Sequence, residues 1–140
     1  MGRVNVGRVI VGGLLAGLVI NFSEFVLNTY VIEQAMAAAM NKMSLPPIGV
    51  EMVMCFVVLG FLLGITTVWL YAAIRPRFGP GVATATYAAL AVWFLSYVYP
   101  NAFIIVMHVF PRKEMVISTI WGLPEIVIAG IAGAWAYTEA

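Results

Sequence analysis

The sequence predicts an all-α membrane protein, built as a bundle of four transmembrane helices. The first reason is composition: of 140 residues, 64% are hydrophobic and only 9% are charged, whereas soluble domains have about 25% charged residues. A chain this short cannot bury so much apolar surface away from water. The second reason is that the apolar residues fall into four long stretches, and the third is the proline- and glycine-rich sequence between two of them.

Each of the four stretches is long enough to cross a bilayer, which takes about 20 predominantly apolar residues. They cover residues 9–30, 50–74, 81–99 and 115–137. We expect residues 1–140 to form a single transmembrane domain. The first stretch has a basic start, but its apolar part exceeds the roughly 7–15 residues of a cleaved signal peptide, so we expect it to be retained.

The connecting sequences predict how the spans are joined. Residues 32–47 are expected to contain a short helix that stops before Pro46 and Pro47. RPRFGPG, at 75–81, predicts a tight turn, so the second and third spans should form an antiparallel hairpin. PNAFIIVMHVFPRKE, at 100–114, is apolar but too short to cross. It predicts either a short interfacial helix between the third and fourth spans or a kinked extension of the third span.

The orientation follows from Lys and Arg in the short loops, which favour the cytoplasmic side. One side carries Arg3, Arg8, Arg75 and Arg77, and the other carries Lys42, Arg112 and Lys113. This bias favours both termini in the cytoplasm. Aromatic residues near the span ends, Tyr97 among them, are expected to form belts at the membrane surfaces.

One face of the first span carries a stripe of small and polar residues. Its members recur every three or four positions and are Gly13, Gly17, Asn21, Glu24 and Asn28. Residues at this spacing lie on one side of a helix. Glycines at this spacing let a neighbouring helix approach closely, and polar side chains can bond across such a contact. We therefore expect the stripe to face protein and not lipid.

The second and fourth spans offer matching surfaces. The second contains Gly60 and Gly64. The fourth has small residues and one carboxylate on one face: Gly122, Glu125, Ala129, Ala132 and Ala136. Pro124 should loosen the fourth helix just before its glutamate. If the first and fourth helices pack antiparallel, Glu24 and Glu125 come within one or two helical turns of each other.

The protonation of these glutamates follows from the cost of charge in lipid. An ionised carboxylate at mid-membrane costs at least about 2.5–3.5 kcal/mol on insertion scales. The apolar bodies of the spans contain no Lys or Arg. We therefore expect Glu125 to be neutral and to donate to Asn21, to a carbonyl or to water. Glu24 lies nearer the surface, with Arg112 and Lys113 as candidate partners.

Other chemistry finds little support in the sequence. His108 is the sole histidine; imidazole can ligate haem or chlorophyll, but a lone histidine at an interface does not predict such a cofactor. The sequence has no H-E-x-x-H zinc motif and no nucleophile paired with a base, so it predicts neither a metal site nor an enzyme. Cys55 is the one cysteine, and the net charge of +1 does not suggest nucleic-acid binding.

Three stretches carry a resemblance to known sequences: RVIVGGLLAGLVINFSEFVLN, GFLLGITTVWLYAAIRPRFGPG and WGLPEIVIAGIAGAWAY. Together they resemble a group of small, uncharacterised bacterial four-helix integral membrane proteins. The resemblance covers most of the chain, because each stretch stands at the matching place in the order of spans. It implies the fold and a multi-pass protein of the bacterial inner (cytoplasmic) membrane, and it implies no activity.

Two functions remain open at this point. The first is a non-enzymatic accessory or scaffolding subunit, which packs through its small-residue seams and Glu/Asn contacts in a larger membrane complex or a homo-oligomer. Its partners are then the lipid bilayer and other membrane subunits or copies of itself. The second is a small proton-coupled transporter or channel that uses Glu24 and Glu125.

Overall fold

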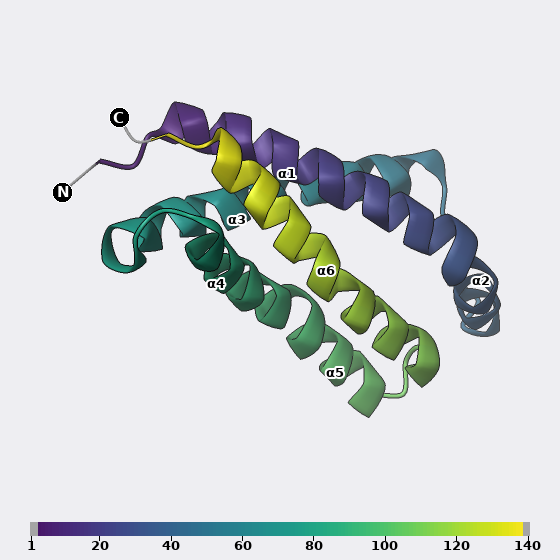
Figure 1. Cartoon of the computed structure of the whole chain (residues 1–140). Coiled ribbons are helices and arrows are strands. Elements are labelled where there is room, and N and C mark those ends of the chain that lie inside the picture. The colour runs from purple at the N-terminus through teal and green to yellow at the C-terminus, as the bar shows by residue number, and fades with distance from the viewer. Residues whose placement is uncertain (1–2, 139–140) are drawn as a thin grey trace.

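The computed structural model describes residues 3–138, and every regular element in that range is helical (Figure 1). The elements are α1 (Val6–Val26), the π-helical turn η1 (Leu27–Val31), α2 (Glu33–Lys42), α3 (Val50–Phe78), α4 (Val82–Trp93), the π-helical turn η2 (Phe94–Val98), α5 (Tyr99–Val106) and α6 (Arg112–Ala136). The helices in this range that are long and apolar enough to cross a membrane are Val6–Val31, Val50–Phe78, Val82–Val106 and Arg112–Ala136. The predicted fold class is confirmed: an all-α membrane protein with four candidate spans.

The third span is longer than the sequence suggested, because α4, η2 and α5 form one continuous helix. The apolar segment after residue 99 is therefore the kinked extension and not a separate interfacial helix. Pro100 has no backbone N–H, so the carbonyl of Ser96 lacks its usual helical partner. The chain absorbs this with a π turn, in which the Tyr99 N–H bonds to the Phe94 carbonyl.

The second span also runs further than expected. α3 continues through Pro76, so the turn to α4 is confined to the residues after Phe78. Gly79 and Gly81 have φ of +84° and +124°, which glycine adopts without strain. The Thr84 hydroxyl donates to the Gly79 carbonyl at 2.7 Å and fixes the turn.

The two described chain ends lie at the same end of the bundle (Figure 1). There the helices are close together, since many core residues are alanines, which are Ala16, Ala72, Ala85, Ala88, Ala89 and Ala129. A Cβ added to Gly12 of α1 would lie 2.5 Å from the carbonyl oxygen of Gly133 in α6. Towards the opposite end, which carries α2, α1 and α6 diverge in Figure 1.

The interface between α1 and α3 is built on four glycines of the predicted packing faces. A Cβ on Gly13 would meet Ile65 at 2.5 Å, and one on Gly64 would meet the Gly13 carbonyl at the same distance. Gly17 lies equally close to Phe61, and Gly60 accommodates the side chain of Asn21. The two backbones are therefore in direct contact along this seam.

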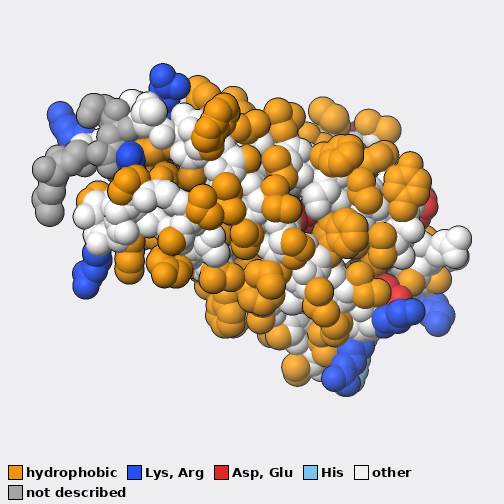
Figure 2. Space-filling view, in the orientation of Figure 1, with side chains coloured by type: hydrophobic (Ala, Val, Ile, Leu, Met, Phe, Trp, Pro, Cys, Tyr) orange, Lys and Arg blue, Asp and Glu red, His pale blue; other side chains and the backbone are white. Residues whose placement is uncertain are grey.

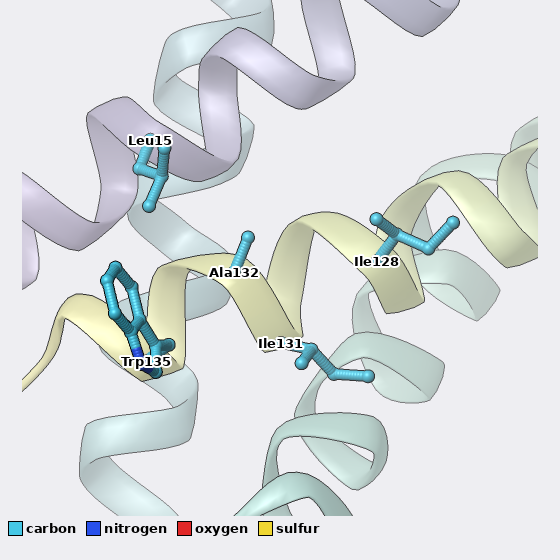
Figure 3. Close-up of a pocket in the computed structure, with 5 residues that line it drawn as sticks. All are labelled: Leu15, Ile128, Ile131, Ala132 and Trp135. Carbon is cyan, nitrogen blue, oxygen red and sulfur yellow. The ribbon is translucent and has the colours of Figure 1, made fainter.

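The outer surface agrees with a bilayer environment. Hydrophobic side chains cover most of the face in Figure 2, while Lys and Arg gather at its two ends. A shallow hollow on this outer surface, between α1 and α6, is lined by Leu15, Ile128, Ile131, Ala132 and Trp135 (Figure 3). Its lining side chains are apolar, and Trp135 is 85% exposed, so lipid chains fit it without any special chemistry.

Candidate functional site: two carboxyl groups on one tyrosine

Glu24 and Glu125 meet on the phenol of Tyr97. The Tyr97 hydroxyl lies 3.0 Å from Glu24 Oε1, and it is also within hydrogen-bonding distance of Glu125 Oε1. The residues come from three elements: α1, η2 and α6. The predicted proximity of the two carboxyl groups is therefore found, with a tyrosine between them.

The local sequence explains how Tyr97 reaches this position. It belongs to the π turn that precedes Pro100, and π turns in long helices frequently occur at functional sites. Its ring lies against Gly122, one turn before Glu125: a Cβ there would be 2.6 Å from the ring carbon Cδ1. Gly122 therefore packs against another helix, and the group that it contacts there is the ring of Tyr97.

The site is buried at its inner end and more open at its outer end. Glu125 is 4% exposed and Tyr97 8% exposed, while Glu24 is half-buried and Asn28 is exposed. Glu125 Oε2 is buried and has no hydrogen-bond partner among residues 3–138. The groups that act on this carboxyl are Glu24, Tyr97 and the nearby Ser23 hydroxyl, none of which is a cation.

Asn28 holds the carboxyl group of Glu24, which lies at the more open end of the site. Its Nδ2 lies 2.8 Å from the main-chain carbonyl of Glu24 and 2.8 Å from Glu24 Oε2. A carbonyl can only accept, so the atom between these two oxygens must be the amide nitrogen. Glu24 Oε2 therefore accepts a hydrogen bond from Asn28.

Further polar side chains tie the helices together around this site. Trp121 Nε1 donates to the Ser23 hydroxyl at 2.9 Å, joining α6 to α1. Asn21 Nδ2 donates to the Val57 carbonyl of α3 at 3.2 Å. Trp93, at the end of α4, donates to the main-chain carbonyl of Thr119 in α6 at 2.8 Å.

Several expectations about partners were wrong. Glu125 pairs with Tyr97 and not with Asn21, which turns towards α3. Glu24 bonds to Tyr97 and Asn28 and not to Arg112 or Lys113. The reason is distance along the helix. Arg112 precedes Glu125 in α6 by about 20 Å at a rise of about 1.5 Å per residue, and Glu125 is level with the site.

Two further expectations need correction. Tyr97 is buried inside the bundle and does not belong to a surface belt. Asn28 shares its stripe with buried glycines yet is exposed, because it lies in the π turn η1, in which Leu27 is the buried residue. One sequence feature could have indicated that Tyr97 points inward. It lies three residues before a proline inside a span, where the helix must rearrange.

His108 stands apart from this site. It is exposed, has a φ of +53° and lines a shallow hollow with Lys42 between α2 and the turn before α6. Among the described residues, no three His, Cys, Asp or Glu side chains lie close enough together to hold a metal ion.

The chemistry available to the site is proton binding and transfer. A phenol can accept a proton from one carboxyl group and donate its own to another. Carboxyl groups inside membrane spans mark ion or proton sites, or bond helices together. Comparison with protein-family models, with curated proteins and with solved structures found no match for this chain.

Proposed function

We propose that the protein is a non-enzymatic scaffolding or accessory subunit of a membrane assembly, which offers the start of α3 to a partner helix. The observation that carries this proposal is the run Val50–Phe56, in which all seven consecutive residues are exposed. Seven residues make about two helical turns. No face of α3 is buried over these turns by the rest of the described chain, whereas Thr67, Val68 and Ala72 are buried further along.

The exposed turns suit a helix–helix contact. They carry Met52, Met54 and Phe56, and flexible thioethers adapt to irregular surfaces. Association of helices in lipid depends on close van der Waals packing and on polar contacts between helices. Since Glu51 also lies on these turns, a partner with a polar group at the same depth would gain a hydrogen bond.

The inward polar contacts support the same proposal. Interhelical hydrogen bonds in membranes stabilise by roughly 0.6–2 kcal/mol each, and those of Trp121, Asn21 and Trp93 each join a different pair of helices. They favour one arrangement of the bundle. A preformed unit loses less conformational entropy when it binds a partner.

Native Cys55 provides the test, because it is the sole cysteine and lies within the exposed run. Membranes are treated with a short thiol-to-thiol crosslinker, and products are separated by size and identified by mass. We expect crosslinked species that disappear in Cys55→Ser: a dimer for a homo-oligomer, or a defined larger product for a complex.

A matched control moves the thiol to another exposed membrane-facing site. Ile120 is 66% exposed on α6, so Cys55→Ser/Ile120→Cys probes random collisions at the same protein concentration. Equal yields from the two positions, or no product from Cys55 in native membranes, would count against a partner on α3.

The same proposal assigns the protein to a bacterial inner membrane with both termini in the cytoplasm. Arg8, Arg75 and Arg77 belong to the end that carries the termini, in agreement with the positive-inside rule. A reporter that is active only in the cytoplasm, fused to the C-terminus, tests this orientation. An inactive cytoplasmic reporter, together with activity from a C-terminal reporter that works only on the opposite side, would contradict it.

A second function, a small proton-coupled transporter or channel, is favoured by the carboxyl pair on Tyr97. Four helices barely enclose a pathway, so this function requires an oligomer. Proton or solute flux is measured in liposomes for wild type, Glu24→Gln and Glu125→Gln. Flux that both substitutions abolish would favour transport over the scaffold.

A further inference from the structure

We propose that Glu24, Tyr97 and Glu125 form a proton-binding site, in which one proton rests on Glu125 and the negative charge rests on Glu24. This site does not depend on the scaffolding function. A transporter would use it, but binding a proton does not require moving one across the membrane. The hydrogens available between the oxygen atoms, and the partners of each oxygen, support this assignment.

The Tyr97 hydroxyl has one hydrogen, yet its oxygen is within hydrogen-bonding distance of a carboxyl oxygen from Glu24 and of one from Glu125. The phenol can donate to only one of them. The other contact is a hydrogen bond only if that carboxyl group supplies the hydrogen. The cluster therefore holds at least one carboxyl proton.

The position of the proton follows from the partners of each carboxyl. As a carboxylate, Glu24 has a donor for each oxygen, since Asn28 donates to Oε2 and Tyr97 can donate to Oε1. Glu125 is 4% exposed, and its Oε2 has no partner within residues 3–138. As a carboxylate, Glu125 would carry its charge in a buried place with no cation of the described chain beside it and with Oε2 unpaired, which costs far more than a buried neutral acid. Glu125 therefore donates its Oε1 proton to the Tyr97 oxygen, and the Tyr97 hydroxyl donates to Glu24 Oε1.

The surrounding elements supply no cation that would replace the proton. The groups that act on Glu125 from the described chain are Glu24 of α1, the Ser23 hydroxyl of α1 and Tyr97 of η2. Neither α3 nor α4 contributes a charged group to this carboxyl. Arg112 and Lys113 begin α6, about 20 Å along the helix axis.

A proton also fits the site better than a metal ion. Tyr97 is in hydrogen-bonding contact with both carboxyl groups. A metal cation needs several oxygen ligands around it. Calcium, for example, takes about six to eight oxygen atoms at about 2.3–2.6 Å. The described residues contain no group of three or more His, Cys, Asp or Glu side chains that could hold one.

The site exchanges with water through its outer end. Asn28 is exposed and Glu24 half-buried, whereas Glu125 is buried. For transfer, the Glu125 O–H breaks as its proton joins the Tyr97 oxygen, and the Tyr97 hydrogen passes to Glu24 Oε1. Two O–H bonds break and two form, and the negative charge moves from Glu24 to Glu125. A proton from water thus reaches Glu125 by the reverse relay.

The chain is well suited to a direct test, because its six acidic residues are all glutamates. The whole protein is labelled with ¹³C at the glutamate side-chain carboxyl carbon, placed in lipid nanodiscs and titrated by NMR. Signals are assigned with Glu24→Gln and Glu125→Gln. At neutral pH we expect a protonated signal from Glu125 and an ionised signal from Glu24.

Coupling between the two signals distinguishes the relay from two isolated acids. Two groups that share a proton titrate together, so both signals should shift over the same pH interval. Tyr97→Phe should remove this coincidence and leave two separate transitions. Glu51→Gln, at an exposed position on α3, should leave both signals unchanged.

Two results would overturn the proposal in wild type alone, whether or not Tyr97→Phe folds. One is an ionised signal from both glutamates throughout the neutral range. The other is independent titration of Glu24 and Glu125 with the phenol in place. A protonated, coupled pair in a protein that shows no flux in liposomes would refute transport and leave this inference standing.

Discussion

Gly64 is the position where one methyl group should weaken the bundle most clearly. A Cβ at this residue would lie 2.5 Å from the Gly13 carbonyl oxygen and 2.5 Å from the Gly17 backbone nitrogen. Both are main-chain atoms of α1, so no side-chain rotation relieves the contact. In Gly64→Ala, α1 and α3 must separate.

The size of the effect follows from that separation. Ordinary contact begins at 3.4 Å, so the helices must move apart by about 0.9 Å, and a gap of 0.5–1 Å already forfeits a quarter to a half of a dispersion contact. Overpacking of this kind costs about 1–3 kcal/mol. Replacing glycine with alanine within a helix returns about 0.5–1 kcal/mol. We expect a net loss of about 1–2 kcal/mol in the free energy of unfolding.

The assay is reversible unfolding in mixed micelles with increasing SDS, followed by helical circular dichroism. Gly7→Ala is the matched control, since a Cβ there meets its nearest atom at an ordinary 3.6 Å. It should leave stability unchanged or raise it slightly. A Gly64→Ala protein as stable as the Gly7→Ala protein would show that the α1–α3 seam is not closely packed.

Three further predictions concern the polar contacts. Tyr97→Phe leaves two carboxyl groups without their shared partner and should lower the unfolding free energy by about 1–3 kcal/mol, in the same SDS assay; an unchanged midpoint would contradict the contact. Trp121→Phe and Ser23→Ala should each lower the unfolding free energy by roughly 0.6–1.7 kcal/mol. The double variant should lose less than the sum, because both substitutions remove the same hydrogen bond. His108→Ala should leave the visible absorbance of the purified protein without change, and a haem or chlorophyll band that the substitution abolishes would restore His108 as a ligand.

The sequence predicted most of the fold because membrane spans are recognisable from local composition. The span ends were less predictable: Pro76 and Pro100 looked like boundaries, yet the helices continue through both. A proline removes one backbone hydrogen bond, and within a long helix a π turn or a neighbouring residue can absorb the loss. The approach of Glu24 to Glu125 was predictable from their faces and from the antiparallel order of the spans.

The partners of those glutamates were not predictable. Tyr97 is 73 residues from Glu24 and 28 from Glu125 in sequence. Its inward direction depends on the π turn before Pro100 and on the space left by Gly122. Neither feature has a periodic signature, so Tyr97 looked like a membrane-surface aromatic residue.

The amino-acid sequence by itself determined that this chain belongs in lipid and crosses it as helices, since the free energy of transferring side chains from water adds up along each stretch. The tertiary structure alone decided which polar groups touch. Those contacts depend on the rotation and axial position of each helix, which are set by backbone approaches such as Gly13 to Gly64 and Gly12 to Gly133. A shift of about 1.5 Å, one residue along a helix, would change every partner of the carboxyl pair.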